Sequence, residues 1–317
     1  NQFQSLLIMS IAKKLIILSS VLVISCGEAP KKKANKNNDT PQIDGVWERK
    51  GTIQFVNEDP VDTLIFGKDI EGFKNIKIYS KGNIFWINNS PSQIYKGAGG
   101  YGKFKITKNT LTEFMSHGSG SFASFLHYMN DSLRTSSINY DFKYNLTKSN
   151  YTQLGGNVPN SDDESISYGE YYEKLPSLRK SKIDGVWKRA YEISFVNGVA
   201  VDTTSVPADA LLDVKVFKDG YFLVQVDQTR LINDSSKPEY GGGGGYGQFD
   251  YDESGNLVEY GEFNSGAWPF TERGPRDKKN AHYASVSFYD DDLYIQITKD
   301  TLGQGAAGRG VVYKRVE

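Results

Sequence analysis

The chain has 317 residues, enough for two domains of ordinary size that each bury a hydrophobic core. Its 37 Lys and Arg residues balance 38 Asp and Glu residues, and a net charge of −1 gives no electrostatic basis for binding nucleic acid. The single cysteine excludes a scaffold of intramolecular disulfides. Because 20 Tyr, 17 Phe and 4 Trp stand against 3 Met, the composition favours strands, and we expect an all-β protein.

The N-terminal segment has the order of charged, apolar and small residues that is typical of a secretory signal. Met9 is followed by two lysines, an apolar run over Leu15–Ile24 and a small residue before Cys26. This run of ten residues falls well short of the roughly 20 that a membrane-spanning helix needs. We therefore expect translation to begin at Met9 and residues 1–26 to contain a signal peptide.

The end of this segment, Val23-Ile24-Ser25-Cys26, resembles the lipobox of bacterial lipoproteins. The resemblance implies that Cys26 receives diacylglycerol, becomes the mature N-terminus and anchors the chain in the cell envelope, at the outer membrane. Acylation also accounts for Cys26 better than a free thiol, because an unpaired thiol is a liability in an oxidising compartment. Residues 27–42 hold no aromatic or branched aliphatic side chain, which predicts a flexible tether.

The rest of the chain is an internal repeat. The five residues Ile-Asp-Gly-Val-Trp at 43–47 recur letter for letter at 183–187, an offset of 140 residues. Gly-Gly-Tyr-Gly at 99–102 recurs at 244–247 with a slightly larger offset, so loops changed length while strands were kept. The repeat predicts two domains of one kind, over residues 43–176 and 183–317.

Within each copy, apolar and polar residues alternate with the period of two that is typical of strands. Ala284, Val286 and Phe288 alternate with polar neighbours up to the three aspartates at 290–292, after which the pattern resumes. Asp219-Gly220 marks another tight turn. About eight strands joined by short turns suit a sheet closed into a barrel, which removes its unpaired edges. We predict two tandem antiparallel up-and-down β-barrels.

Two segments depart from the strand pattern. Residues 121–130 have apolar side chains at helical spacing, which predicts a short helix. In the second copy that place is taken by a long Gly/Pro-containing stretch that holds Trp268. Two interpretations stay open for each segment, a lid over the mouth of a barrel or a plug that completes the core.

Each copy begins with a Gly-x-Trp motif that resembles the first-strand signature of lipocalin-like barrels. The motif residues are Gly45 and Trp47 in the first copy and Gly185 and Trp187 in the second. The resemblance implies that each tryptophan packs across the closed bottom of its barrel under a basic residue from near the last strand. Arg315 matches that basic residue in the second copy, and Lys174 stands there in the first. Arginine over an indole is a favourable cation–π pair, and lysine is a poorer substitute. The glycine-rich strand and its successor further resemble lipocalin-like domains of envelope lipoproteins of the Bacteroidetes type.

No pattern in the sequence predicts an enzyme, a metal site or a cofactor. The three histidines, His117, His127 and His282, lack the spacing of zinc ligands. No Gly-x-Ser-x-Gly nucleophile motif occurs, and the glycine run at 241–245 is not followed by the Lys-Ser/Thr of a phosphate loop.

Carboxylates leave two points open. The acidic turns at 162–164 and 290–292 are interpreted as solvated loops, although paired carboxylates also serve glycoside hydrolysis. Glu113 and Glu259 occupy matched strand positions. They would bind a polar group of a ligand if they point inward, and they would be solvated if they point outward.

Two interpretations of function are favoured over a third, a glycan-acting hydrolase. In the first, a barrel encloses a small apolar or amphipathic ligand between aromatic walls. In the second, the barrels are filled by their own aromatic residues, and the chain is an envelope scaffold with a protein partner.

The candidate ligand-binding residues are all aromatic. They are Tyr101, Phe104, Tyr246, Phe249 and Trp268. Because Tyr101 and Phe104 are three residues apart, at most one residue of each such pair is expected to face inward unless the glycines introduce a bulge. Trp268 would close the mouth of its barrel, which favours the second domain as the binder.

Overall fold

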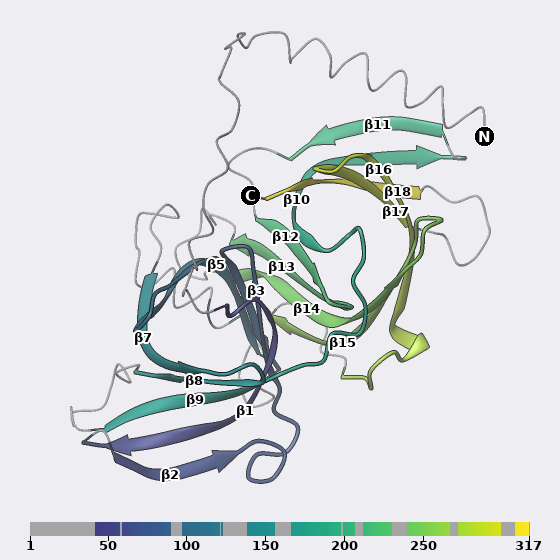
Figure 1. The fold of residues 1–317 in the computed structure, drawn as a ribbon. Coiled ribbons are helices and arrows are strands. Elements are labelled where there is room, and N and C mark those ends of the chain that lie inside the picture. Colours follow the sequence, from purple (N-terminus) through teal and green to yellow (C-terminus); the bar gives the residue numbers. More distant parts are fainter. Residues whose placement is uncertain are drawn as a thin grey trace, which may run out of the picture. The chain divides into compact units, whose positions relative to one another are not determined.

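The described part of the chain consists mainly of β-strands. The computed structural model describes residues 42–57, 59–89, 97–120, 122, 138–155, 166–197, 199–206, 212–229, 240–266, 272–298 and 308–316. These residues form eighteen strands and one short 3₁₀ helix, Lys278–Asn280 (Figure 1). None of their helices is long and apolar enough to span a membrane. The prediction of an all-β protein is confirmed. Cys26, Trp268 and most of the predicted helix at 121–130 lie outside the described residues.

The two copies contain nine strands each. The first copy has β1 (Gly45–Val56), β2 (Asp59–Ile65), β3 (Asn75–Ser80), β4 (Asn83–Asn88), β5 (Ala98–Ile106), β6 (Leu111–Gly120), β7 (Ile138–Leu146), β8 (Asn150–Leu154) and β9 (Ile166–Lys174). The second copy has β10 (Gly185–Val196), β11 (Val199–Ser205), β12 (Asp213–Lys218), β13 (Tyr221–Thr229), β14 (Tyr240–Tyr251), β15 (Asn256–Gly266), β16 (Ala281–Asp290), β17 (Leu293–Thr298) and β18 (Gly308–Arg315).

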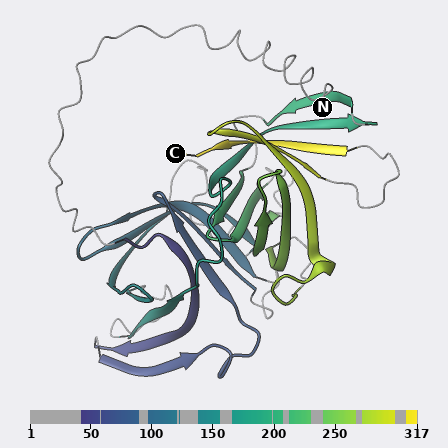
Figure 2. The ribbon, with the colours of Figure 1, turned by 45° about the vertical axis from the view of Figure 1, so that its right-hand side comes forward.

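Each copy folds into a closed antiparallel barrel. In the first copy β3 to β9 follow β1 in sequence order, and β9 pairs back onto β1, so that eight strands form the wall. The remaining strand, β2, pairs with the second half of β1. The second copy repeats this order, with β18 closing onto β10 and β11 added beside it. Figures 1 and 2 show each sheet curving until its last strand lies beside its first. The predicted pair of eight-stranded barrels is confirmed.

Local sequence explains the tight turns between paired strands. Lys81-Gly82 joins β3 to β4, and Asp219-Gly220 joins β12 to β13. All four residues have positive φ, between 48° and 90°, which matches the right-handed twist of a two-residue hairpin. Glycine is needed in each pair because only glycine adopts positive φ without steric cost.

The glycine-rich strands face bulges in their partner strands. The register of β5 against β6 shifts between Tyr101 and Gly102, and β14 shifts against β15 at the matched place. A Cβ at Gly102 would lie 2.0 Å from the carbonyl oxygen of Phe114, too close for any other residue type. The extra residue that the glycines accommodate therefore belongs to the neighbouring strand.

Among the described residues, buried apolar side chains form one main cluster inside each barrel, a smaller cluster between β10, β17 and β18, and one cluster shared by the two copies. The interior of the first barrel holds Trp47, Tyr79, Leu111, Met115, Tyr151 and Tyr172, and that of the second holds Trp187, Phe217, Phe249, Leu257, Tyr294 and Tyr313. The shared cluster joins Ile78, Phe85 and Tyr101 of the first copy to Val216, Leu223 and Tyr246 of the second. Strands such as β3 are consequently buried on both faces.

Candidate ligand-binding site

In the second barrel, the tryptophan of the Gly-x-Trp motif is fully buried under a cation. Trp187 donates a hydrogen bond from Nε1 to the carbonyl oxygen of Ile183, at 2.8 Å, and Cζ of Arg315 lies 4.1 Å from the ring centroid. Nη1 of Arg315 also donates to the carbonyl oxygen of Asp184 at 3.2 Å. A Cβ at Gly185 would lie 2.2 Å from this Nη1. The glycine leaves the space through which the arginine reaches the indole.

The first barrel repeats this arrangement with lysine. Trp47 donates from Nε1 to the carbonyl oxygen of Ile43 at 2.8 Å, and Nζ of Lys174 lies 5.1 Å from the indole. The same Nζ donates to the carbonyl oxygen of Asp44 at 2.9 Å. A Cβ at Gly45 would lie 2.5 Å from Cε of Lys174. The motif therefore binds a basic side chain from the end of the last strand in both copies.

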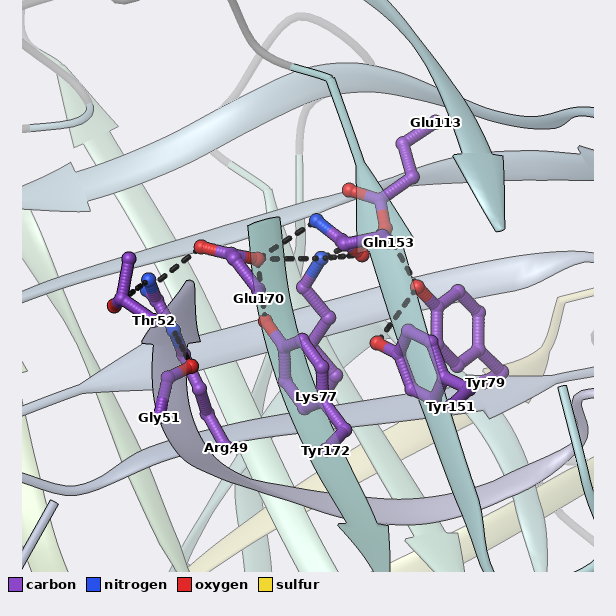
Figure 3. A network of polar contacts seen from close by, with 10 residues as sticks. All are labelled: Arg49, Gly51, Thr52, Lys77, Tyr79, Glu113, Tyr151, Gln153, Glu170 and Tyr172. Atoms are coloured by element: carbon purple, nitrogen blue, oxygen red, sulfur yellow. Dashed lines mark hydrogen bonds and ion pairs between the residues drawn. The ribbon is translucent and has the colours of Figure 1, made fainter. Parts of the chain in front are cut away.

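A charged network occupies the interior of the first barrel (Figure 3). Nζ of Lys77 lies 2.8 Å from Oε1 of Glu113 and donates to Oε1 of Gln153 at 3.0 Å. The hydroxyl of Tyr79 donates to the same Glu113 oxygen at 2.5 Å. Burial, followed by the negative charge of Glu113, raises the pKa of Tyr79 well above its ordinary value. Glu113 thus points inward, which decides between the two orientations that the sequence leaves open.

A second carboxylate continues the network along β9. Oε2 of Glu170 accepts hydrogen bonds from Tyr172 and Gln153, both at 2.7 Å, and Oε1 lies 2.6 Å from Nη1 of Arg49. Burial by itself would raise the pKa of Glu170, but the charges of Arg49 and Lys77 outweigh burial and lower it. Two cations and two carboxylates therefore balance each other inside this barrel.

A cavity of about 350 Å³ borders the network. Its polar lining includes Asn75 and the four charged side chains of the network, and its aromatic lining comprises Trp86, Phe122, Tyr140, Phe142, Tyr168 and Tyr172. Trp86 and Phe122 meet edge to face with ring centroids 5.0 Å apart. Asn75 is 6% exposed, and its Oδ1 is buried without a hydrogen-bond partner in the part of the chain that the structure describes. The cavity therefore combines apolar walls with a hydrogen-bond acceptor that those residues do not satisfy.

The second barrel carries the same buried Lys–Glu–Gln group. Nζ of Lys215 lies 2.8 Å from Oε1 of Glu259 and donates to Gln296 at 3.4 Å, and Gln296 donates to the other Glu259 oxygen at 3.3 Å. Burial alone would raise the pKa of Glu259, but Lys215 and a hydrogen bond from His282 lower it to about 2. Burial would lower the pKa of Lys215, but the charge of Glu259 raises it.

The two barrels differ in how they neutralise the arginine of their first strand. Arg49 pairs with Glu170 on the last strand of the first barrel, and Val311 takes the place of Glu170 in the second. Arg189, the counterpart of Arg49, instead pairs with Glu192 on its own strand and contacts Asp213 on β12 at 3.3 Å. The paired charge is kept while the strand that supplies the carboxylate changes.

The predicted aromatic candidates fall into three places. Phe104 packs against the interior cluster of the first barrel, and Phe249 lies in that of the second. Tyr101 and Tyr246 lie in the cluster shared by the two copies, so one member of each pair faces inward. Trp268 and Cys26 are outside the described residues, and so is His127. Within the described ranges, no group of three or more His, Cys, Asp or Glu residues could hold a metal ion.

The sequence motifs do not point to the lysines and glutamines of the two networks. One signal for the lysines is present, because Ile-Lys-Ile at 76–78 and Val-Lys-Val at 214–216 repeat a lysine inside an apolar strand. A lysine kept at matched positions among buried residues indicates an interior charge with a partner. Gln153 and Gln296 carry no comparable signal.

Comparisons with known proteins find distant structural similarity only. No family model and no curated protein matches the chain. The chain is similar to an uncharacterized protein, YLR301w, from Saccharomyces cerevisiae, at 10% identity and a TM-score of 0.38, over 86% of this chain and 98% of that one. A protein of unknown function of the DUF3598 family from Nostoc punctiforme gives 8% identity and a TM-score of 0.22, over 86% and 96%.

A third similar structure is a mutant of the vaccine antigen transferrin binding protein B from Haemophilus parasuis. It gives 9% identity and a TM-score of 0.22, over 88% of this chain and 77% of that one. These similarities identify no family for the chain, and a shared fold by itself does not define a function.

Proposed function

We propose that the chain is a non-enzymatic envelope lipoprotein, anchored through Cys26, whose first barrel binds a small amphipathic ligand. The observation that carries the ligand proposal is the cavity of about 350 Å³ beside the Lys77–Glu113 network. Its size lies in the range of small-molecule sites, and it combines aromatic walls with a few polar groups.

The cost of the network supports a functional role. Burying charged side chains costs several kcal/mol per ion, and well-packed apolar residues often serve stability as well or better. Lys77 and Glu113 nevertheless have side chains only 6% and 5% exposed. A barrel that had only to fill its own interior would not need these charges. A polar interior beside aromatic walls suits a ligand with one polar and one apolar part.

Ligand binding is tested by titrating the delipidated chain, from residue 27 onward, with N-phenyl-1-naphthylamine, a neutral apolar fluorescent probe. We expect saturable binding that Trp86→Ala weakens, because Trp86 lines the cavity. Tyr283→Ala is the matched control, since Tyr283 is 37% exposed and lies outside the cavity lining. Absence of saturable binding by the intact chain would contradict this function and favour an envelope scaffold with filled barrels.

Anchoring is tested separately by Cys26→Ser. We expect this substitution to abolish labelling by a palmitate analogue and to move the chain from the detergent phase to the aqueous phase. Retained label in the variant would exclude Cys26 as the lipidation site. The binding experiment uses delipidated protein, so ligand binding and lipid anchoring are tested independently of each other.

A further inference from the structure

A second cavity adjoins the first beside the second half of β1, where that strand pairs with β2. It also measures about 350 Å³, and its apolar lining comprises Leu64, Phe66, Ile70 and Phe73. Phe66 and Phe73 meet edge to face with ring centroids 4.6 Å apart. Arg49 and Tyr168 line both cavities, so the two spaces are neighbours that share part of their walls. We refer to the first space as the inner cavity and to the second as the outer cavity.

Among the described residues that line the inner cavity, no charged side chain is unpaired. Arg49 contacts Glu170 at 2.6 Å and Lys77 contacts Glu113 at 2.8 Å, so each cation already has its carboxylate. A charged ligand group entering this interior would lose its hydration without gaining an unpaired opposite charge. This interior therefore suits an uncharged polar group better than a charged one.

Asn75 defines the kind of polar group that fits. Its buried Oδ1 has no hydrogen-bond partner among the described residues, and a buried acceptor left unpaired is destabilising. A hydroxyl group of a ligand would satisfy this oxygen. Several hydroxyls on one head group would also find acceptors in Glu113, Glu170 and Gln153, which line the same cavity.

The apolar side of the outer cavity suits an apolar chain, while Thr52, Gln54 and Asp62 form its polar side. Arg49, which lines this cavity, is neutralised by Glu170. It donates a hydrogen bond from Nη2 to Oγ1 of Thr52 at 2.7 Å, and its Cζ lies 5.2 Å from the centroid of the Phe66 ring. Arg49 therefore forms part of the boundary between the polar and the apolar space without needing a charged partner from the ligand.

The second barrel has different residues at the matched positions. When the strand pairings of the two barrels are compared, Glu192 of β10 stands where β1 has Thr52. Arg309 of β18 stands where β9 has Tyr168. Glu192 forms ion pairs with both Arg189 and Arg309. Charged side chains thus occupy the place where the first barrel has the boundary between its two cavities.

We infer that the first barrel binds an uncharged, polyhydroxylated head group in the inner cavity and a single apolar chain in the outer cavity, as in an alkyl glycoside or a neutral glycolipid. This inference rests on the proposed function and specifies its ligand class. Both halves of the ligand contribute to affinity, so each half alone binds more weakly than the whole molecule.

The test uses n-octyl-β-D-glucoside below its critical micelle concentration, with octanoate, octylammonium and glucose as comparison probes, in calorimetric titrations of the delipidated chain. We expect octyl glucoside to bind at least about tenfold more tightly than either charged octyl probe. Glucose should bind at least about tenfold more weakly than octyl glucoside, because it lacks the apolar chain.

Variants then test which cavity binds which half of the ligand. Leu64→Ala and Phe73→Ala should each weaken octyl glucoside binding severalfold, and Asn75→Leu should weaken it while leaving the circular dichroism spectrum unchanged. Val201→Ala, in the exposed counterpart of β2, should leave affinity unchanged. Equal or tighter binding of octanoate or octylammonium would overturn the inference, as would saturable naphthylamine binding without octyl glucoside binding. Those two outcomes leave the proposed container function intact, whereas no binding of any probe would overturn both.

Discussion

Replacing Gly185 by alanine tests the physical basis of the Gly-x-Trp motif. The new Cβ would lie 2.2 Å from Nη1 of Arg315, so the guanidinium has to leave its position over Trp187. The arginine then loses a cation–π contact, which contributes about 0.5–2 kcal/mol. It also loses hydrogen bonds to the carbonyl oxygens of Asp184 and Asp291, which contribute about 0.5–1.5 kcal/mol each.

Backbone strain adds to this loss. Gly185 has φ of 153°, where an L side chain costs on the order of 1–3 kcal/mol. We therefore expect Gly185→Ala to lower the free energy of unfolding by about 3–7 kcal/mol. Arg315→Ala alone should cost about 2–4 kcal/mol, from the lost cation–π contact and hydrogen bonds. In a chain that already carries Arg315→Ala, Gly185→Ala should lower the free energy of unfolding only by the cost of the backbone strain.

The double-mutant cycle is measured by urea denaturation with circular dichroism detection. Gly67→Ala is the control for strain without a clash, because Gly67 has φ of 82° and nothing within 4 Å of the added Cβ. We expect the control to cost about 1 kcal/mol. Additive effects of Gly185→Ala and Arg315→Ala, within about 0.5 kcal/mol, would refute the argument that the glycine makes room for the arginine.

Three further predictions concern the barrel interiors. Lys215→Met should destabilise the protein by about 3–5 kcal/mol because it leaves Glu259 buried without its cation. The control Lys188→Met, at an exposed position of the same sheet, should change the free energy of unfolding by less than about 0.5 kcal/mol. Equal effects of the two substitutions would argue against a stabilising buried pair. Since the pKa of Glu259 falls from its ordinary 4.5 to about 2, its contribution to stability is complete above pH 4.5 and is lost as the pH falls through 2. Unfolding measured across this range should show a shallower pH dependence in Glu259→Gln, and an unchanged slope would exclude this carboxylate as a source. Gly102→Ala should be among the most destabilising substitutions of the first barrel, because its Cβ would lie 2.0 Å from the carbonyl oxygen of Phe114. A thermal unfolding midpoint close to that of the parent chain would contradict the conclusion that glycine is required opposite the bulge of β6.

The sequence by itself determines the architecture of each copy. The repeat of Ile-Asp-Gly-Val-Trp marks where each barrel begins, and the period of two with short turns predicts an antiparallel meander. Asp219-Gly220 is visible as a hairpin turn because the positive φ that the turn needs restricts the residues that can stand there. These features depend on neighbouring residues along the chain, which is why they can be predicted from the sequence.

The tertiary structure alone decides which face of a strand lines the cavity. Alternation shows that Asn75, Lys77 and Tyr79 share one face of β3, but it does not show that this face points inward. The usual guide, a polar face towards solvent, fails here because all six residues of β3 are buried. Its apolar face packs in the cluster shared by the two copies, and its polar face meets Glu113 from β6 and Gln153 from β8. Partners 36 and 76 residues away along the chain make a lysine stable inside the barrel, and only closure of the sheet brings them together.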